Sequence, residues 1–120
     1  MLQAVFETQP APAEEMERLL AAARAKRKLS QPVGASAGCI FKNPEEIPAG
    51  RLIDELGLKN ACVGDACVSD VHANFIINRG HARALDITIL NDIIRKEAME
   101  NRGIDLKSEA QVIGDRAPQF

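Results

Sequence analysis

Aromatic side chains are scarce in this sequence: tryptophan and tyrosine are absent, and only four phenylalanines occur among 120 residues. Platforms on which nucleic-acid bases or a cofactor ring could stack are therefore scarce as well. The formal net charge of −2 gives no basic footprint, so we expect no nucleic acid as a partner. No apolar run is long enough to span a bilayer, and we expect no membrane association.

Cysteine is also sparse, and its odd count of three does not indicate a disulfide framework. Cys62 and Cys67 are not a Cys-x-x-Cys pair, and no histidine follows them at zinc spacing. We therefore expect both to be packing residues and expect no metal site. The N-terminal segment has neither the basic region nor the long apolar run of a signal peptide. Together these features predict reduced thiols and a cytoplasmic location.

The residues that are present suit one domain with a real core, since 46% are hydrophobic and 27% are charged. A short β-type run at 2–7 precedes a predicted helix over 10–29. This helix has four apolar side chains at helical spacing, namely Met16, Leu19, Leu20 and Ala23. The breakers of 31–38 predict a loop. A second helix is predicted over 47–57, with Leu52, Ile53 and Leu56 on its apolar face and Gly57 at its end.

The second half predicts two short apolar runs, a strand at 75–77 and a turn at 78–80. Asp86 is a candidate N-cap for a helix from 87 to about 101 that Gly103 ends. Its inner face would carry Leu90, Ile93, Ile94 and Ala98. Residues 104–113 alternate as a strand does, with Leu106, Ala110 and Val112 opposite Lys107, Glu109 and Gln111. The irregular order predicts a small single α+β domain, with a mixed or antiparallel sheet packed with about three helices.

Candidate chemistry is concentrated in residues 35–44, with the sequence ASAGCIFKNP. Cys39 is either a small buried hydrophobe or a thiol that a loop of small residues presents to a ligand as a general acid. Lys42 and Asn43 are either solvated loop residues or an anion-binding pair, in which the lysine is a point charge and the asparagine a donor.

Two further residues each allow two interpretations. His72 is either a structural histidine that donates to a backbone carbonyl or a contact to a ligand. Glu109 is either solvent-exposed or a carboxylate beside a reacting centre. None of these residues is a specific signal when it is taken alone.

Three segments taken together are specific: QPVGASAGCIFKNP at 31–44, AGRLIDELGLKNACVGDACVSDVHANFIIN at 49–78 and LKSEAQVIG at 106–114. In this order and spacing they resemble the C-terminal substrate-binding domain of the UDP-N-acetylenolpyruvoylglucosamine reductase family, from about Leu2 to Gly114. The resemblance implies an oxidoreductase of peptidoglycan synthesis, UDP-N-acetylmuramate dehydrogenase. That enzyme uses FAD and NADPH to reduce the enolpyruvyl ether of UDP-N-acetylglucosamine to a lactyl ether.

The resemblance also implies roles for single residues. Cys39 occupies the position of the family's proton donor, usually a serine, and Glu109 that of the carboxylate that supports the developing enol. Asn43 matches an asparagine that binds the diphosphate of the substrate, and His72 lies in a block that makes a polar contact to it. Lys42 and Arg27 are further substrate-binding candidates.

The implied domain plan places the whole chain, 1–120, in the substrate-binding domain, with a joining strand at 1–10, a body at 11–114 and a tail at 115–120. A glycine-rich flavin loop is absent, so we expect the FAD-binding domain to be a partner supplied in cis or in trans. We expect no cofactor in this chain and no activity from it alone. The alternative is a stand-alone module that binds UDP-sugars without catalysis or that has only a structural role.

Overall fold

The computed structural model describes residues 2–114 and has three helices and four strands. In chain order they are α1 (Ala13–Ser30), β1 (Ala35–Cys39), α2 (Ala49–Glu55), β2 (Cys62–Val63), β3 (Ala66–Val68), β4 (Phe75–Asn78) and α3 (Ala84–Arg102). All strand pairs are antiparallel, and the order in the sheet is β1-β4-β3-β2. The predicted small α+β domain is thus confirmed.

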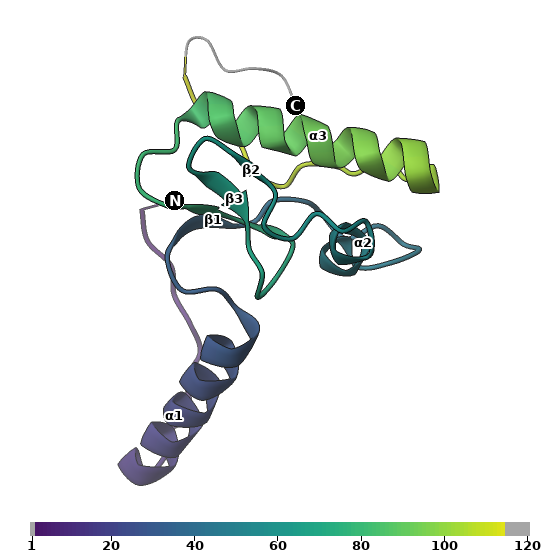
Figure 1. Cartoon of the computed structure of the whole chain (residues 1–120). Helices are drawn as coiled ribbons and strands as arrows, with labels where there is room; N and C mark the ends of the chain where they lie inside the picture. The colour runs from purple at the N-terminus through teal and green to yellow at the C-terminus, as the bar shows by residue number, and fades with distance from the viewer. Residues whose placement is uncertain (1, 115–120) are drawn as a thin grey trace.

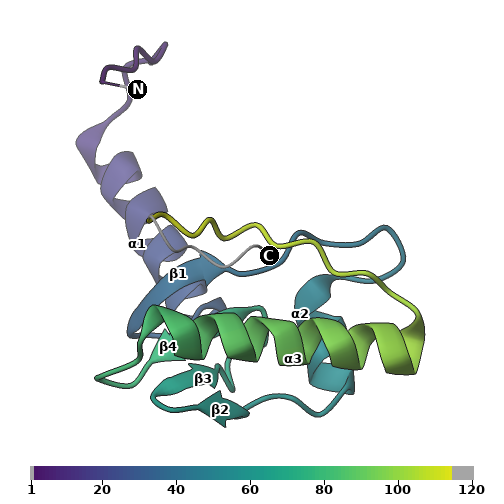
Figure 2. The same ribbon diagram turned by 90° about the horizontal axis from the view of Figure 1, so that it is seen from above.

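The core lies where α3 packs against the sheet and α2 packs against α3, and the chain after α3 runs back beside that helix (Figures 1 and 2). The largest side chains that are fully buried are Phe41, Ile40, Leu52, Ile53, Leu90, Ile94, Leu106 and Val68. The predicted inner face of α3 is confirmed at three positions, but Ile93 is 40% exposed. The core thus reaches from the Ile40–Phe41 segment to the chain that follows α3.

Both ends of α2 follow from its sequence. Pro48 precedes the helix, and Gly57 follows its last turn with a φ of +73°, which glycine adopts without steric cost. The start of α3 differs from our prediction, because its N-cap is Arg83 rather than Asp86. Asp86 lies three residues further on, where its carboxylate accepts the Arg83 N–H at 2.9 Å and so closes a capping box.

Three predictions of backbone structure were wrong. The segment expected to be a loop at 31–38 contains most of β1, which pairs with β4. Residues 2–12 form neither a helix nor a strand. The strand expected at 104–113 is reduced to one bridge between Phe41 and Ser108. The N–H groups of Glu109 and Ala110 both donate to the Ile40 carbonyl, at 2.7 and 3.3 Å, and this doubling interrupts a regular ladder.

Helix α1 forms as predicted and projects away from the rest of the domain (Figure 1). Its acidic first turn and basic last turn complement the helix dipole. None of its residues is buried, and its apolar stripe is exposed by 50% at Met16, 59% at Leu19 and 52% at Leu20. The amphipathic pattern therefore predicted the helix correctly, but the described part of the chain does not cover its apolar face.

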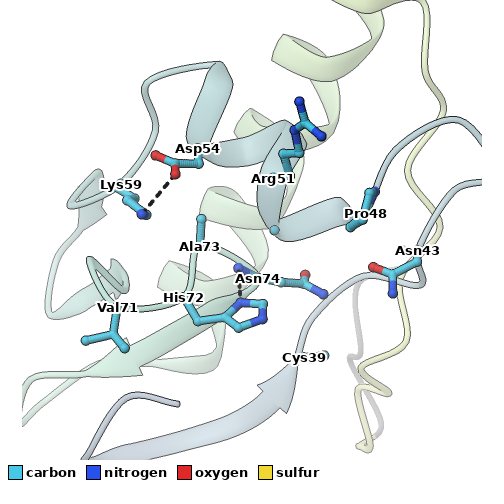
Figure 3. A pocket seen from close by; sticks show the side chains of 11 residues that line it. Cys39, Asn43, Pro48, Arg51, Asp54, Lys59, Val71, His72, Ala73 and Asn74 are labelled. Atoms are coloured by element: carbon cyan, nitrogen blue, oxygen red, sulfur yellow. Dashed lines mark hydrogen bonds and ion pairs between the residues drawn. The ribbon is translucent and has the colours of Figure 1, made fainter. Parts of the chain in front are cut away.

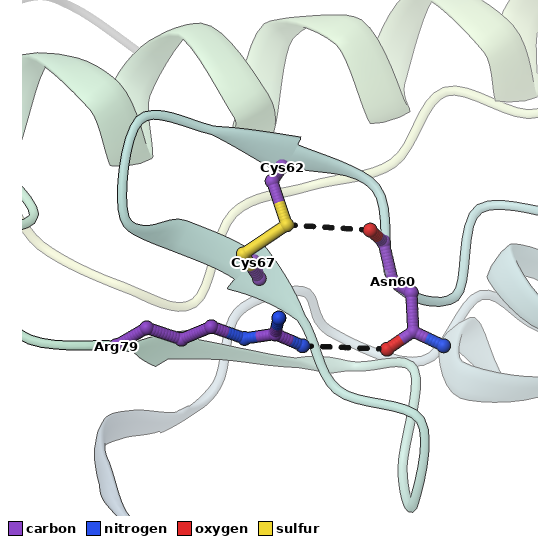
Figure 4. Close-up of a disulfide and its surroundings, with 4 residues drawn as sticks. All are labelled: Asn60, Cys62, Cys67 and Arg79. Carbon is purple, nitrogen blue, oxygen red and sulfur yellow. Dashed lines mark hydrogen bonds between the residues drawn. A yellow bond between two sulfur atoms is a disulfide. The ribbon is translucent and has the colours of Figure 1, made fainter.

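Cys62 and Cys67 are joined in a disulfide (Figure 4). They are opposed partners in the β2–β3 hairpin, with Cα atoms 4.1 Å apart, and the hairpin turns on Gly64 and Asp65. Our interpretation of both as reduced packing residues was therefore wrong: directly opposed positions hold their Cβ atoms close enough to bridge. The cytoplasmic location stays a prediction.

Candidate active site

Cys39 is the last residue of β1 and is exposed with a free thiol. The register of β1 against β4 shifts between Ser36 and Cys39, and Gly38 in this bulge has a φ of +81°. A bulge bends its strand and redirects the side chains beside it, and glycine takes this φ without a Cβ penalty. The small residues of 35–38 therefore allow the bulge that precedes Cys39. Because Cys39 is exposed, its interpretation as a buried hydrophobe is wrong.

A cavity of about 320 Å³ opens beside Cys39, between α2 and the turn before β4 (Figure 3). Three of the predicted site residues line it, namely Cys39, Asn43 and His72. They come from the end of β1, the loop after it and the turn at 71–74. The other lining residues are Pro48, Gly50, Arg51, Asp54, Lys59, Val71, Ala73 and Asn74.

The amide of Asn43 is oriented by the start of α2. Its Oδ1 accepts the Ala49 N–H at 3.0 Å, and this satisfies one of the N–H groups that a helix leaves unpaired at its first turn. Because the partner is an N–H, the oxygen must point toward the helix and the Nδ2 group away from it. Asn43 can thus offer its amide donor to an acceptor in the cavity.

His72 is held in one tautomer by the backbone. Its Nδ1 accepts the Asn74 N–H at 3.2 Å, so in the neutral ring the proton lies on Nε2. Of the two interpretations, the structural one had the ring donating to a carbonyl, whereas in the observed bond the ring nitrogen accepts. The ring packs edge-on against Phe75 with centroids 5.0 Å apart. Gly50 leaves room for it, since a Cβ there would lie 2.8 Å from His72 Cε1.

Sequence reasoning missed two basic residues that line the cavity, Arg51 and Lys59. Each has an acidic partner: Arg51 Nε lies 3.1 Å from Glu55 Oε1, and Lys59 Nζ lies 3.0 Å from Asp54 Oδ2. Both residues belong to the second of the three resembling segments. Their positive charge, together with the donors of Asn43 and His72, makes the cavity suitable for an anionic group.

Other predicted site residues are not brought into this cavity. Arg27 lines a separate cavity of about 450 Å³ with Arg24 and Lys28, beside Ser36 and Gly38. Lys42 and Glu109 line neither cavity and are exposed. Glu109 still lies on the segment next to Cys39, because its N–H donates to the Ile40 carbonyl at 2.7 Å.

The described glycines do not form a cradle for a flavin diphosphate. Those with positive φ are spread over separate turns and a bulge, from Gly34 to Gly114. We therefore assign none of the residues 2–114 to a flavin. Within residues 2–114, no three metal-ligating side chains of His, Cys, Asp or Glu gather into a site. No helix in this part of the chain has the length and apolar character needed to cross a membrane.

The chain is a small α+β domain with a cavity beside a free, exposed thiol. The family model for the C-terminal domain of UDP-N-acetylenolpyruvoylglucosamine reductase matches residues 28–113. The chain belongs to this family.

Individual relatives agree with the family match. The reductase of Geotalea uraniireducens is 44% identical over 115 residues, which cover 95% of this chain and 38% of that protein. The reductase of Chloroflexus aggregans is 48% identical over 94 residues, 78% of this chain and 32% of that protein. The crystal structure of the reductase from Thermus caldophilus matches with a TM-score of 0.72 and 45% identity, covering 86% of this chain and 36% of that one. The chain thus spans about a third of the length of these relatives.

Proposed function

We propose that this chain is the substrate-binding and proton-donating part of a UDP-N-acetylenolpyruvoylglucosamine reductase. The observation that carries the proposal is the meeting of Cys39, Asn43 and His72 at one cavity in a member of this family. The substrate class is UDP-N-acetylglucosamine enolpyruvate, and the reaction belongs to peptidoglycan synthesis. The flavin-binding part and NADPH are the remaining partners, and the isolated chain is inactive without them.

The diphosphate of the substrate would bind at the polar side of the cavity. Asn43 Nδ2 and His72 Nε2 supply neutral donors. Arg51 and Lys59 supply positive charge, which Glu55 and Asp54 partly offset. A diphosphate suits this set, because charge-assisted hydrogen bonds to phosphate oxygens are among the stronger polar contacts. Lys42 remains a proposed contact from the same loop, and Arg27 a proposed contact from the second cavity.

Cys39 would donate the proton. FAD bound outside this chain, once NADPH has reduced it, would supply the hydride that adds to the terminal carbon of the enol ether. The adjacent carbon then carries negative charge, and the exposed thiol can deliver a proton to it as a general acid. Glu109 would support the developing enol from the segment that pairs with Ile40.

The experiment that tests the proposal is a titration of the ¹⁵N-labelled chain with UDP-N-acetylglucosamine, followed through backbone amide shifts. We expect weak binding that moves residues 39–43 and 72, because the contacts of this chain alone must bear the full cost of ordering the ligand. Shifts confined to other surfaces, or no shifts at all, would contradict the proposal.

Asn43→Asp sharpens this titration. The carboxylate can still accept the Ala49 N–H, but it has no donor for the ligand and repels a diphosphate, so binding should be lost. The matched control is Asn78→Asp: Asn78 Oδ1 likewise accepts backbone N–H groups, from Gly80 at 2.9 Å and Ala82 at 3.0 Å, away from this cavity. The control should bind as the unmodified chain does.

A further inference from the structure

The backbone groups of Phe41, two residues after Cys39, are paired with a side chain. The side-chain Oδ1 of Asn74 accepts the Phe41 N–H at 3.0 Å, and Asn74 Nδ2 donates to the Phe41 carbonyl at 2.9 Å. The Ile40 N–H donates to the Asn74 carbonyl at 2.9 Å. Asn74 is only 3% exposed. Its amide thus continues the pairing of β1 with β4 for one more residue after the strand itself ends.

The same residue also orients the other half of the cavity. The Asn74 N–H donates to His72 Nδ1 at 3.2 Å, and this bond determines which ring nitrogen carries the proton. In Figure 3, His72 and Asn74 lie together below α2, and Cys39 and Asn43 lie on the chain beside them. Asn74 therefore contacts both sides of the cavity: the backbone segment that carries Cys39 and Asn43, and the ring of His72.

We propose that Asn74 is a positioning residue, which holds the Cys39–Asn43 segment and the His72 ring in the arrangement that receives the ligand. The identity of that ligand rests on the function proposed above, but the positioning role of Asn74 does not. Asparagine suits the role because its amide offers a donor and an acceptor side by side to one residue's N–H and carbonyl. An ionised aspartate lacks the donor, whereas a protonated aspartic acid has both groups.

This difference gives a test, because the side chain of Asn74→Asp has the donor only when it is protonated at low pH. In Asn74→Asp the carboxyl is buried and faces the Phe41 carbonyl, and both conditions raise a carboxyl pKa; we expect them to outweigh the Phe41 N–H, which favours the ionised form. At pH 8 the ionised side chain leaves the buried Phe41 carbonyl without a donor. We expect altered amide shifts at 39–43 and 72, and a dissociation constant for UDP-N-acetylglucosamine roughly tenfold above that of the unmodified chain. Toward pH 5 protonation restores the donor, and both differences should disappear.

Other groups titrate or carry charge at the same place. His72 faces Asn74 from the same turn, Arg51 and Asp54 come from α2, Lys59 comes from the loop after it, and Cys39 comes from β1. The unmodified chain contains all of these groups, so its own pH profile is measured with the same ligand. The result that matters is the ratio of the two dissociation constants at each pH.

The matched control is Asn91→Asp, since Asn91 is a fully buried asparagine of α3 whose Nδ2 lies 3.4 Å from Ser108 Oγ, away from the cavity lining. It should lower the unfolding temperature without moving the shifts at 42, 43 and 72 or the affinity; shifts at 40 and 41 are left out of this comparison, because Ser108 bridges Phe41 and its Oγ donates to the Ile40 carbonyl. Normal shifts and affinity in Asn74→Asp at pH 8 would overturn the inference, as would equal effects of the two variants. If the unmodified chain fails to bind UDP-N-acetylglucosamine, the proposed function fails, and the shifts of the ligand-free variants still decide the role of Asn74.

Discussion

Gly50→Ala should change the shape of the cavity, and with it the affinity for the ligand, while it changes the stability of the domain little. Gly50 lies in the first turn of α2, where alanine would favour the helix by about 1 kcal/mol over glycine. A Cβ at this position would lie 2.8 Å from His72 Cε1, 3.1 Å from His72 Nδ1 and 3.6 Å from Asn74 Cβ. The substitution therefore suits the backbone but collides with the imidazole.

The size of the collision sets the expected effect. Carbon atoms in contact prefer separations of about 3.5–4.0 Å, so the ring must retreat by roughly 0.7 Å or more. Phe75 is packed against the ring at a centroid distance of 5.0 Å, which limits retreat on that side. Overpacking of this kind costs about 1–3 kcal/mol. Because alanine also favours the helix by about 1 kcal/mol, the free energy of unfolding should fall by only about 0–2 kcal/mol. The bond from the Asn74 N–H should weaken, and UDP-N-acetylglucosamine should bind at least about tenfold more weakly.

Gly103→Ala is the control, and denaturant unfolding with ligand titration is the assay. Gly103 ends α3 at a φ of +64°, and a Cβ there would meet nothing within 4 Å. Alanine in this left-handed conformation should cost about 1–2 kcal/mol of stability and leave the affinity unchanged. The reasoning is refuted if Gly50→Ala binds the ligand normally, or if both variants lose affinity in proportion to their loss of stability.

Two further predictions concern stability. The Cys62–Cys67 disulfide closes a loop of sequence separation 5, so chain entropy predicts that its reduction lowers the free energy of unfolding by about 2 kcal/mol. Thiol titration of the denatured chain should then find one free thiol before reduction and three after it; three before reduction would show that the disulfide is absent. Arg83 holds the pKa of Asp86 below its ordinary value, first through their side-chain hydrogen bond. Because the folded pKa is the lower one, this stabilisation is complete above the unfolded pKa of about 3.9 and is lost as pH falls through the folded pKa. Asp86→Asn should flatten the stability profile in that acid range, and an unchanged profile would contradict the assignment.

The fold could be predicted from the sequence wherever local pattern and tertiary packing agree. Leu90, Ile94 and Ala98 recur at helical spacing and are buried, and Gly57 and Gly103 end helices as expected. The pattern failed where pairing depends on a distant segment. Residues 104–113 alternate like a strand, but only Ser108 bridges to Phe41, because the N–H groups of Glu109 and Ala110 both donate to the Ile40 carbonyl and break the one-to-one pairing of a ladder.

The sequence also indicated part of the candidate site. Residue types alone left Cys39, Asn43 and His72 open, and the resemblance to the reductase family is what indicated them as site residues; the fold brings these three to one cavity. Sequence alone could not place Arg27 in a different cavity, since that depends on the direction in which α1 leaves β1. The disulfide had a usable signal: a two-residue turn at Gly64 and Asp65 makes positions 62 and 67 direct partners.

The central claim is that Cys39 supplies a proton within a complete reductase, and separate half-reactions test it most directly. The chain is fused in place of the matching C-terminal part of the Geotalea uraniireducens reductase, and stopped flow follows flavin reduction by NADPH and then reduction of the enolpyruvyl substrate. We predict that Cys39→Ala slows the second half-reaction by at least about 100-fold and spares the first. Cys39→Ser should retain much more activity than Cys39→Ala, and Glu109→Gln should impair the second half-reaction only. Substrate reduction at the unmodified rate in Cys39→Ala would contradict the account.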